Sequence, residues 1–100
     1  MELFDWEKNS GDIPANLKST FNTMYSLSRS YIDKKNADYM LACVIWVDLK
    51  TDRVIGGFIF KPNKPNKKLV FNGNGDVKVE TLKIDLKLNS MGYKINRLGV

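Results

Sequence analysis

The chain has 100 residues, of which 43% are hydrophobic and 27% are charged. This is the composition of a folded domain, so we expect residues 1–100 to form one domain and not a disordered chain. The sequence contains no histidine and only one cysteine, Cys43. These counts exclude histidine-dependent catalysis, a metal site built on histidines or several cysteines, and an internal disulfide bond.

The N-terminal sequence and the apolar runs bear on cellular location. Residues 1–7 are acidic and lack the basic region and long apolar stretch of a secretory signal. The longest apolar run, Tyr39 to Val47, is far shorter than the ~20 residues that a membrane helix needs. A single thiol is typical of a reducing compartment. We therefore expect a cytoplasmic protein, of a bacterium or a virus-infected cell, that has no membrane partner.

The net charge of +5 is unevenly distributed along the chain. Residues 1–52 carry six Lys/Arg and eight Asp/Glu, a net charge of −2, whereas residues 53–100 carry ten and three, a net charge of +7. A basic half can attract phosphate groups or an acidic protein surface, although lysines also keep small domains soluble. The C-terminal half is therefore where an acidic partner is expected.

The first half of the chain predicts an arm followed by a long helix. Residues 1–13 are expected to be an irregular arm that docks through its apolar side chains. A helix is predicted from Pro14 to Lys35, because proline is favoured at a first helical position and the apolar residues recur at helical spacing. These apolar positions are Leu17, Phe21, Met24, Tyr25, Tyr31 and Ile32.

The middle of the chain predicts an antiparallel hairpin. Tyr39 to Leu49 is a nearly continuous run of β-forming residues, which is typical of a strand buried on both faces. A turn at residues 50–52 leads to a second strand, Arg53 to Lys61. Within it, Gly56-Gly57 indicates a bulge or a close approach of another group to the backbone.

The Lys61 to Lys68 segment contains two Lys-Pro-Asn triplets followed by two lysines. Prolines disfavour a sheet interior, so this segment is predicted to be an exposed loop of extended character. Leu69 to Phe71 is predicted as a short third strand, and Asn72 to Asp76 as a tight turn.

The segment from Val77 to Met91 admits two interpretations. Leu82, Ile84, Leu86 and Leu88 alternate with polar residues, which favours a half-buried strand. Against this, residues 88–93 resemble the end of a helix that is closed by Gly92. We favour strands here and a last strand from Tyr93 to Leu98. The predicted fold class is α+β, with an N-terminal helix packed on a four- to five-stranded antiparallel sheet. The alternative order is α-β-β-β-α-β, with a second helix at about residues 79–91.

The sequence offers no arrangement typical of catalysis. Cys43 and the serines have no histidine to activate them, and the nearby carboxylates Asp48 and Asp52 are explained by one turn. No phosphate-binding glycine motif is present, and the Asn72 to Asp76 segment lacks the carboxylates of a calcium loop. We therefore expect a non-enzymatic protein without a metal or another cofactor.

Three surfaces are candidates for binding. The first is the lysine-rich loop, and the second is the polar face of the late strands, which could form a basic platform with nearby aromatic residues. The third is the acidic, aromatic N-terminal arm, where Phe4 and Trp6 are candidate anchors for a protein partner. The basic candidates are Lys61, Lys64, Lys67, Lys68, Lys83, Lys87, Lys94 and Arg97.

Two functions follow from these surfaces. The first is a small nucleic-acid-binding protein whose basic C-terminal half contacts phosphates. The second is a protein inhibitor or modulator, of the anti-defence or immunity type and encoded by a phage or mobile element, that binds a host protein or nucleoprotein machine. Net charge does not separate these functions, because both partners present acidic surfaces. The oligomeric state stays open, since a second subunit of a homodimer could cover residues 39–49.

Overall fold

The computed structural model describes residues 6–9, 13–20 and 23–96. In the described residues, six strands and two helices follow the order β-α-β-β-β-β-α-β. The strands are β1 (Glu7–Asn9), β2 (Met24–Asp33), β3 (Met40–Asp48), β4 (Val54–Lys61), β5 (Lys64–Asn72) and β6 (Tyr93–Ile95). The helices are α1 (Ala15–Thr20) and α2 (Val77–Ser90). The predicted α+β class is confirmed.

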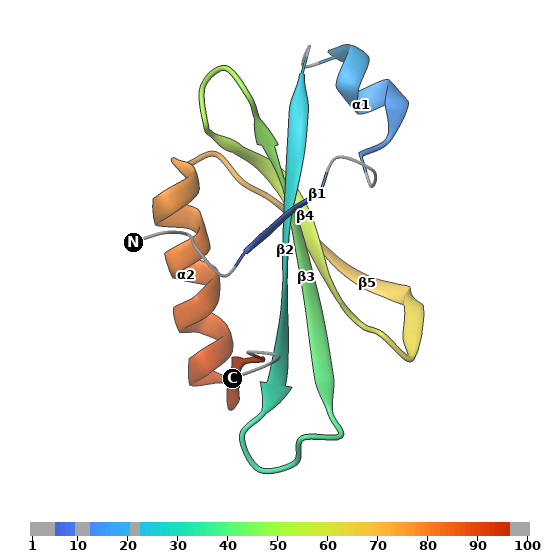
Figure 1. Ribbon diagram of the computed structural model, residues 1–100, viewed down its shortest axis with the longest axis vertical. Helices are drawn as coiled ribbons and strands as arrows, with labels where there is room; N and C mark the ends of the chain where they lie inside the picture. The colour runs from blue at the N-terminus through green and yellow to red at the C-terminus, as the bar shows by residue number, and fades with distance from the viewer. Residues whose placement is uncertain (1–5, 10–12, 21–22, 97–100) are drawn as a thin grey trace.

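The strands form one antiparallel sheet in the order β1-β2-β3-β4-β5, and β6 also pairs with β2. The long α2 helix lies against one face of this sheet, and the short α1 helix lies near one end on the other side (Figure 1). The sheet therefore has one face with a long helix and one face that is largely without helical cover.

The hydrophobic core lies between α2 and the centre of the sheet. Alternate residues of β3 point toward α2 and are almost completely buried, with Cys43, Ile45 and Val47 each 0% exposed. Val77 and Leu88 are the buried hydrophobic residues of α2 on the opposite side of this layer, and Thr81 is buried between them along the helix. The predicted strand at 39–49 is confirmed by β3, which packs in the middle of the sheet as a nearly continuous apolar run should.

Gly57 explains part of the close packing of β4. A Cβ atom at this position would collide with the Val44 carbonyl oxygen and would lie 2.8 Å from Phe71 Cζ. The pairing of β3 with β4 also changes register between Trp46 and Val47. Of the two alternatives predicted for Gly56-Gly57, the close approach to the backbone is present at Gly57, and an irregularity of the pairing lies next to Gly56.

The predicted helix from Pro14 to Lys35 is wrong beyond its first turns. Helix α1 ends at Thr20, and β2 then begins at Met24. Leu27 and Tyr31 are four residues apart, which places them on one face of a helix and equally on one face of a strand. The serines that separate these apolar residues are weak helix formers. Hydrogen bonding to β3 therefore stabilises this segment as a strand.

The preferred interpretation of residues 77–91 as strands is also wrong, and the alternative second helix is right. Only part of the alternating apolar series faces the sheet: Ile84 packs on the core and Leu88 is buried, whereas Leu82 and Leu86 are 57% and 62% exposed. Asp76 caps α2 by accepting a 3.0 Å hydrogen bond from the Lys78 amide. Gly92, with φ of 98°, follows the C-terminal cap, which fits the predicted helix end.

The Lys61 to Lys68 segment is a hairpin and not a loop. Lys61 and Lys64 pair across the turn, and most of the segment belongs to β5. The predicted extended character is confirmed, and Pro65 is tolerated because β5 is an edge strand. The third strand is consequently longer than the predicted Leu69 to Phe71.

An ion pair joins α2 to the sheet. Arg29 Nη1 on β2 donates to Asp85 Oδ2 on α2 at 2.6 Å, and the Tyr31 hydroxyl donates to the other carboxylate oxygen. The Arg29 side chain is only 6% exposed, and its guanidinium lies 4.7 Å from the ring centroid of Trp6. A charge this well buried needs its partner, so this contact constrains the position of α2.

We expect Asp85→Ala to lower the free energy of unfolding by about 3 kcal/mol, because it leaves the buried Arg29 charge without its partner. Chemical denaturation followed by circular dichroism measures this change. Asp38→Ala is the matched control, since Asp38 is an exposed carboxylate in the β2–β3 turn and should change stability little.

The double change Arg29→Met with Asp85→Leu separates the two causes of instability. It removes both charges, so it should destabilise less than Asp85→Ala alone. An equal or larger loss in the double variant would show that packing volume, and not the unpaired charge, accounts for the effect.

Candidate functional site

A groove with a volume of about 800 Å³ lies between α2 and the β3–β5 part of the sheet. Apolar side chains from both layers line the groove, so water molecules inside it have few hydrogen-bond partners there. The sheet contributes Leu41, Ile59, Phe60, Leu69 and Phe71. The other wall consists of Ile84 and Leu88 of α2, Met91 at the C-terminal cap of α2, and Tyr93 of β6.

The groove exists because α2 covers only part of the sheet face. Exposure on this face rises from 8% at Leu41 on β3 to 65% at Leu69 on β5. Ile59 on β4, between them, is partly buried. The apolar face of the sheet therefore continues beyond the helix, and its outer part meets solvent.

Five lysines line this groove: Lys61, Lys64, Lys67, Lys83 and Lys87. Three come from the β4–β5 hairpin and two from α2, so the positive charges lie on both sides of the apolar floor. The one acidic residue of the lining is Glu80, whose Oε1 is 3.6 Å from Lys83 Nζ. In the part of the chain that the structure describes, none of the other four lysines forms an ion pair within 4.0 Å. Such a concentration of one charge sign attracts anionic groups.

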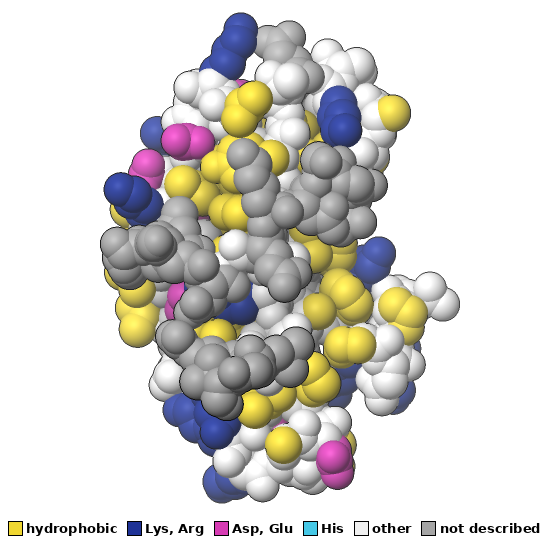
Figure 2. Space-filling model, viewed as in Figure 1, with side chains coloured by type: hydrophobic (Ala, Val, Ile, Leu, Met, Phe, Trp, Pro, Cys, Tyr) yellow, Lys and Arg dark blue, Asp and Glu magenta, His cyan; other side chains and the backbone are white. Residues whose placement is uncertain are grey.

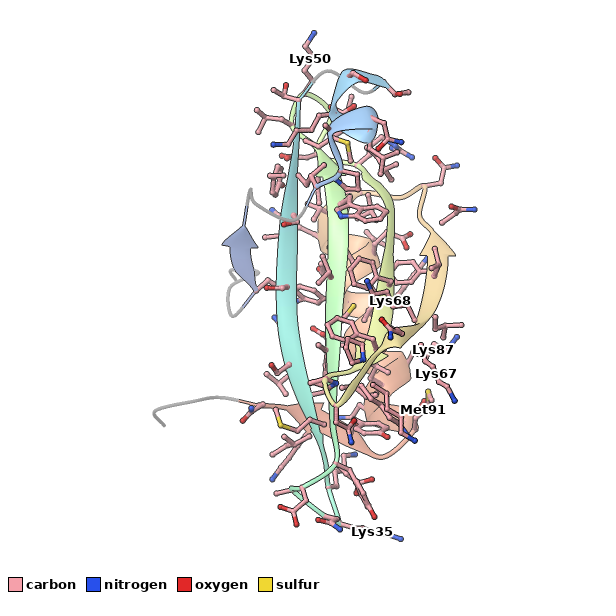
Figure 3. The ribbon with its side chains drawn as sticks, turned by 90° about the vertical axis from the view of Figure 1, so that its right-hand side faces the viewer. Lys35, Lys50, Lys67, Lys68, Lys87 and Met91 are labelled. Carbon is pink, nitrogen blue, oxygen red and sulfur yellow. The ribbon has the colours of Figure 1, made fainter. Side chains whose placement is uncertain are left out.

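The structure thus brings together residues from two of the predicted surfaces. The lysine-rich hairpin and the basic side of the late segment were expected as separate candidates, and they lie on opposite sides of one groove. Figure 3 shows Lys67 near Lys87 and Met91, with Lys35 and Lys50 at the two far ends of the molecule.

Other predicted site residues lie elsewhere. Lys68 lies on the opposite face of the sheet, with Nζ 4.7 Å from the Phe58 ring centroid (Figure 3). Lys94 is exposed on β6 and does not line the groove. Trp6 is 6% exposed and belongs to the core, so the candidate site does not include it. Phe4 and Arg97 fall outside the described residues.

The face opposite α2 carries a row of aromatic side chains. The rings of Trp46, Phe58 and Phe60 follow one another at centroid distances of 5.6 Å, and Lys68 lies over the last two. Hydrophobic side chains are visible on the surface over β4 and β5 (Figure 2). These rings are neither fully buried nor fully exposed. They form a second surface, which meets the groove at Phe60, one of the residues that line the groove.

Sequence reasoning missed the apolar floor of the groove. Ile59 and Phe71 were expected simply as strand residues, and Ile84 and Leu88 were assigned to a strand. The cap residues Asp76 and Gly92 were the available indication that residues 77–90 form a helix. That helix is what converts two basic segments into the two sides of a groove.

The residues considered for catalysis are each explained by burial or by a hydrogen bond within the fold. Cys43 is 0% exposed, and burial raises the pKa of its thiol to about 12. Asp48 accepts a 2.8 Å hydrogen bond from the Lys50 amide within its turn. Asp52 accepts one of 3.1 Å from the Tyr25 hydroxyl, and burial together with this carboxylate raises the pKa of Tyr25 to about 12.

We expect the Cys43 thiol to resist alkylation in the native protein, because it is buried and protonated at neutral pH. Iodoacetamide labelling at pH 8, followed by mass spectrometry, should modify the unfolded protein in urea and leave the folded protein unmodified. Rapid labelling without denaturant would contradict this burial.

We also expect the folded state to lose stability in alkaline solution. The pKa values of Tyr25, Tyr31 and Cys43 are all raised above the ordinary values of 10.0, 10.0 and 9.0, chiefly by burial. Because these groups bind protons more tightly when folded, their contribution is complete below pH 9 and falls as the pH rises above it. Melting temperatures measured from pH 7 to 11 should decrease above about pH 9. Tyr31→Phe should weaken this dependence.

No described helix combines the length and the apolar character needed to cross a membrane. Within residues 6–9, 13–20 and 23–96, no group of three or more potential metal-binding Cys, Asp or Glu side chains occurs. Comparison with protein-family models, curated protein sequences and solved structures gave no match to this chain. The groove and its charges are therefore the features of the molecule that bear on its function.

Proposed function

We propose that this chain is a non-enzymatic binding protein that captures an acidic segment of another protein. The observation that carries this proposal is the groove itself, in which an apolar floor is bordered on two sides by five lysines. A partner with an apolar surface next to carboxylates would gain both hydrophobic burial and favourable electrostatics there. A modulator that occupies an acidic surface of a host protein would act in this way.

The chemistry of the floor favours a protein partner over a nucleic acid. Leucine, isoleucine and methionine side chains supply most of the apolar lining. Nucleic acids are bound by cations along the phosphates together with flat aromatic surfaces for base stacking. Aliphatic side chains instead accept the leucine-like residues of a peptide.

A second candidate function is the binding of single-stranded nucleic acid. The observation that favours it is the row of Trp46, Phe58 and Phe60 with Lys68 on the opposite face of the sheet. Aromatic residues and a cation on an open antiparallel sheet resemble a base-stacking platform. The five groove lysines do not share this face, and therefore we rank this function second.

Reversing two groove charges should weaken binding of an acidic amphipathic peptide. Lys67→Glu with Lys87→Glu places negative charge on both sides of the groove, and we expect the dissociation constant to rise by at least about tenfold. A fluorescein-labelled peptide of leucine and glutamate residues serves as the probe, measured by fluorescence anisotropy. Binding to the unaltered protein should also weaken as salt increases from low to physiological concentration.

The control is Lys35→Glu with Lys50→Glu, which changes net charge equally at positions far from the groove (Figure 3). It should keep most of the affinity. An equal loss in both double variants would mean that net charge alone attracts the peptide. Preference for a single-stranded oligonucleotide, with no measurable peptide binding, would replace this proposal by the second candidate.

A further inference from the structure

We infer that the partner segment binds as an amphipathic α-helix that lies beside α2 over β4 and β5. This inference rests on the proposed function and specifies the conformation and chemistry of the partner. It follows from the width of the uncovered part of the sheet, the distribution of charges around the groove and the chemistry of the β5 edge.

The uncovered part of the sheet has the width of one helix. Strands lie ~4.8 Å apart, so β4 and β5 together present a strip of sheet roughly 10 Å wide. An α-helix with its side chains is also about 10 Å across. Helix α2 packs over the β2–β3 side, where Asp85 contacts Arg29 and Tyr31. A second helix placed next to α2 would therefore cover Ile59, Leu69 and Phe71.

The lysines specify the flanks of this helix. Lys61, Lys64 and Lys67 stand on the hairpin side, and Lys83 and Lys87 stand on the α2 side. A helix in the groove would thus have cations along both margins of its apolar stripe. The matching partner carries Asp or Glu on both sides of a stripe of large aliphatic residues.

A second copy of this chain does not supply such a helix from its described residues. Helix α1 has no acidic residue and carries Lys18. The exposed apolar side chains of α2, Val79, Leu82 and Leu86, are neighbours of Lys83 and Lys87 on the same helix. Placing α2 of another copy in the groove would bring lysines against lysines. The partner helix therefore belongs to a different protein.

An extended segment added to the edge of β5 fits the structure less well. Pro65 removes one backbone N–H from β5, and three lysines lie on this strand, which are features that protect an edge from pairing. A strand added there would also lie beyond β5 and leave the apolar surface above β4 exposed. A helix covers this surface directly.

Two peptides of identical composition test the conformation. Each peptide is 14 residues long and consists of leucine, glutamate and alanine. One has its leucines at helical spacing, and the other has leucines that alternate with polar residues. Fluorescence anisotropy should show at least about tenfold tighter binding of the helical pattern. Circular dichroism should show a gain of helix when that peptide is mixed with the protein.

A pair of protein variants tests the location. Leu69 and Val70 are adjacent on β5, are both 65% exposed and point to opposite faces of the sheet. Leu69→Ser should raise the dissociation constant of the helical peptide by at least about fivefold, because it removes an aliphatic contact in the groove. Val70→Ser should leave it nearly unchanged and serves as the matched control.

The results distinguish two claims: that the groove is the binding site, and that the partner segment binds there as a helix. Equal or tighter binding of the alternating peptide, still weakened by Lys67→Glu with Lys87→Glu, overturns the helix and leaves the groove as the binding site. Equal losses from Leu69→Ser and Val70→Ser place the peptide elsewhere and overturn the inference. Failure of both peptides to bind overturns the proposed function as well.

Discussion

The ion pair between Arg29 and Asp85 is the interaction on which the rest of this structure depends. It joins the middle of α2 to β2, and the Tyr31 hydroxyl donates a hydrogen bond to the other oxygen of the Asp85 carboxylate. Because the Arg29 guanidinium is buried against Trp6, a shift of α2 toward β5 would leave a charge without a partner in the core. The helix is therefore held on the β2 side of a sheet that is wider than the helix.

This off-centre position explains why an apolar surface remains open on β4 and β5. This apolar surface is larger than one exposed leucine side chain, because it combines Leu69 and Phe71 of the sheet with Met91 near the end of α2. Lysines on both sides keep it hydrated and disfavour association of two copies through it. The same lysines would attract the carboxylates of the proposed partner, so protection from self-association and selection of that partner would have one physical basis.

Much of the middle of the chain could be predicted from local sequence patterns. The β3 and β4 strands, the turn between them and the special role of Gly57 follow from apolar runs and glycine chemistry. The groove lysines were also recognisable as candidates, because charge is visible in the sequence. Two elements were not predictable in this way: β2, where four-residue spacing suits either structure, and α2, where leucines alternate although only some of them face the core.

The sequence by itself determined the α+β class, the absence of histidine chemistry and the basic character of the C-terminal half. Only the tertiary structure decided that Lys67 and Lys87 share one groove while Lys68 lies on the other face of the sheet. The reason is that adjacent residues of a strand point to opposite faces, whereas residues 20 positions apart can meet when a helix folds back on a sheet. Charge is a property of single residues, but a binding site is a property of how distant segments pack.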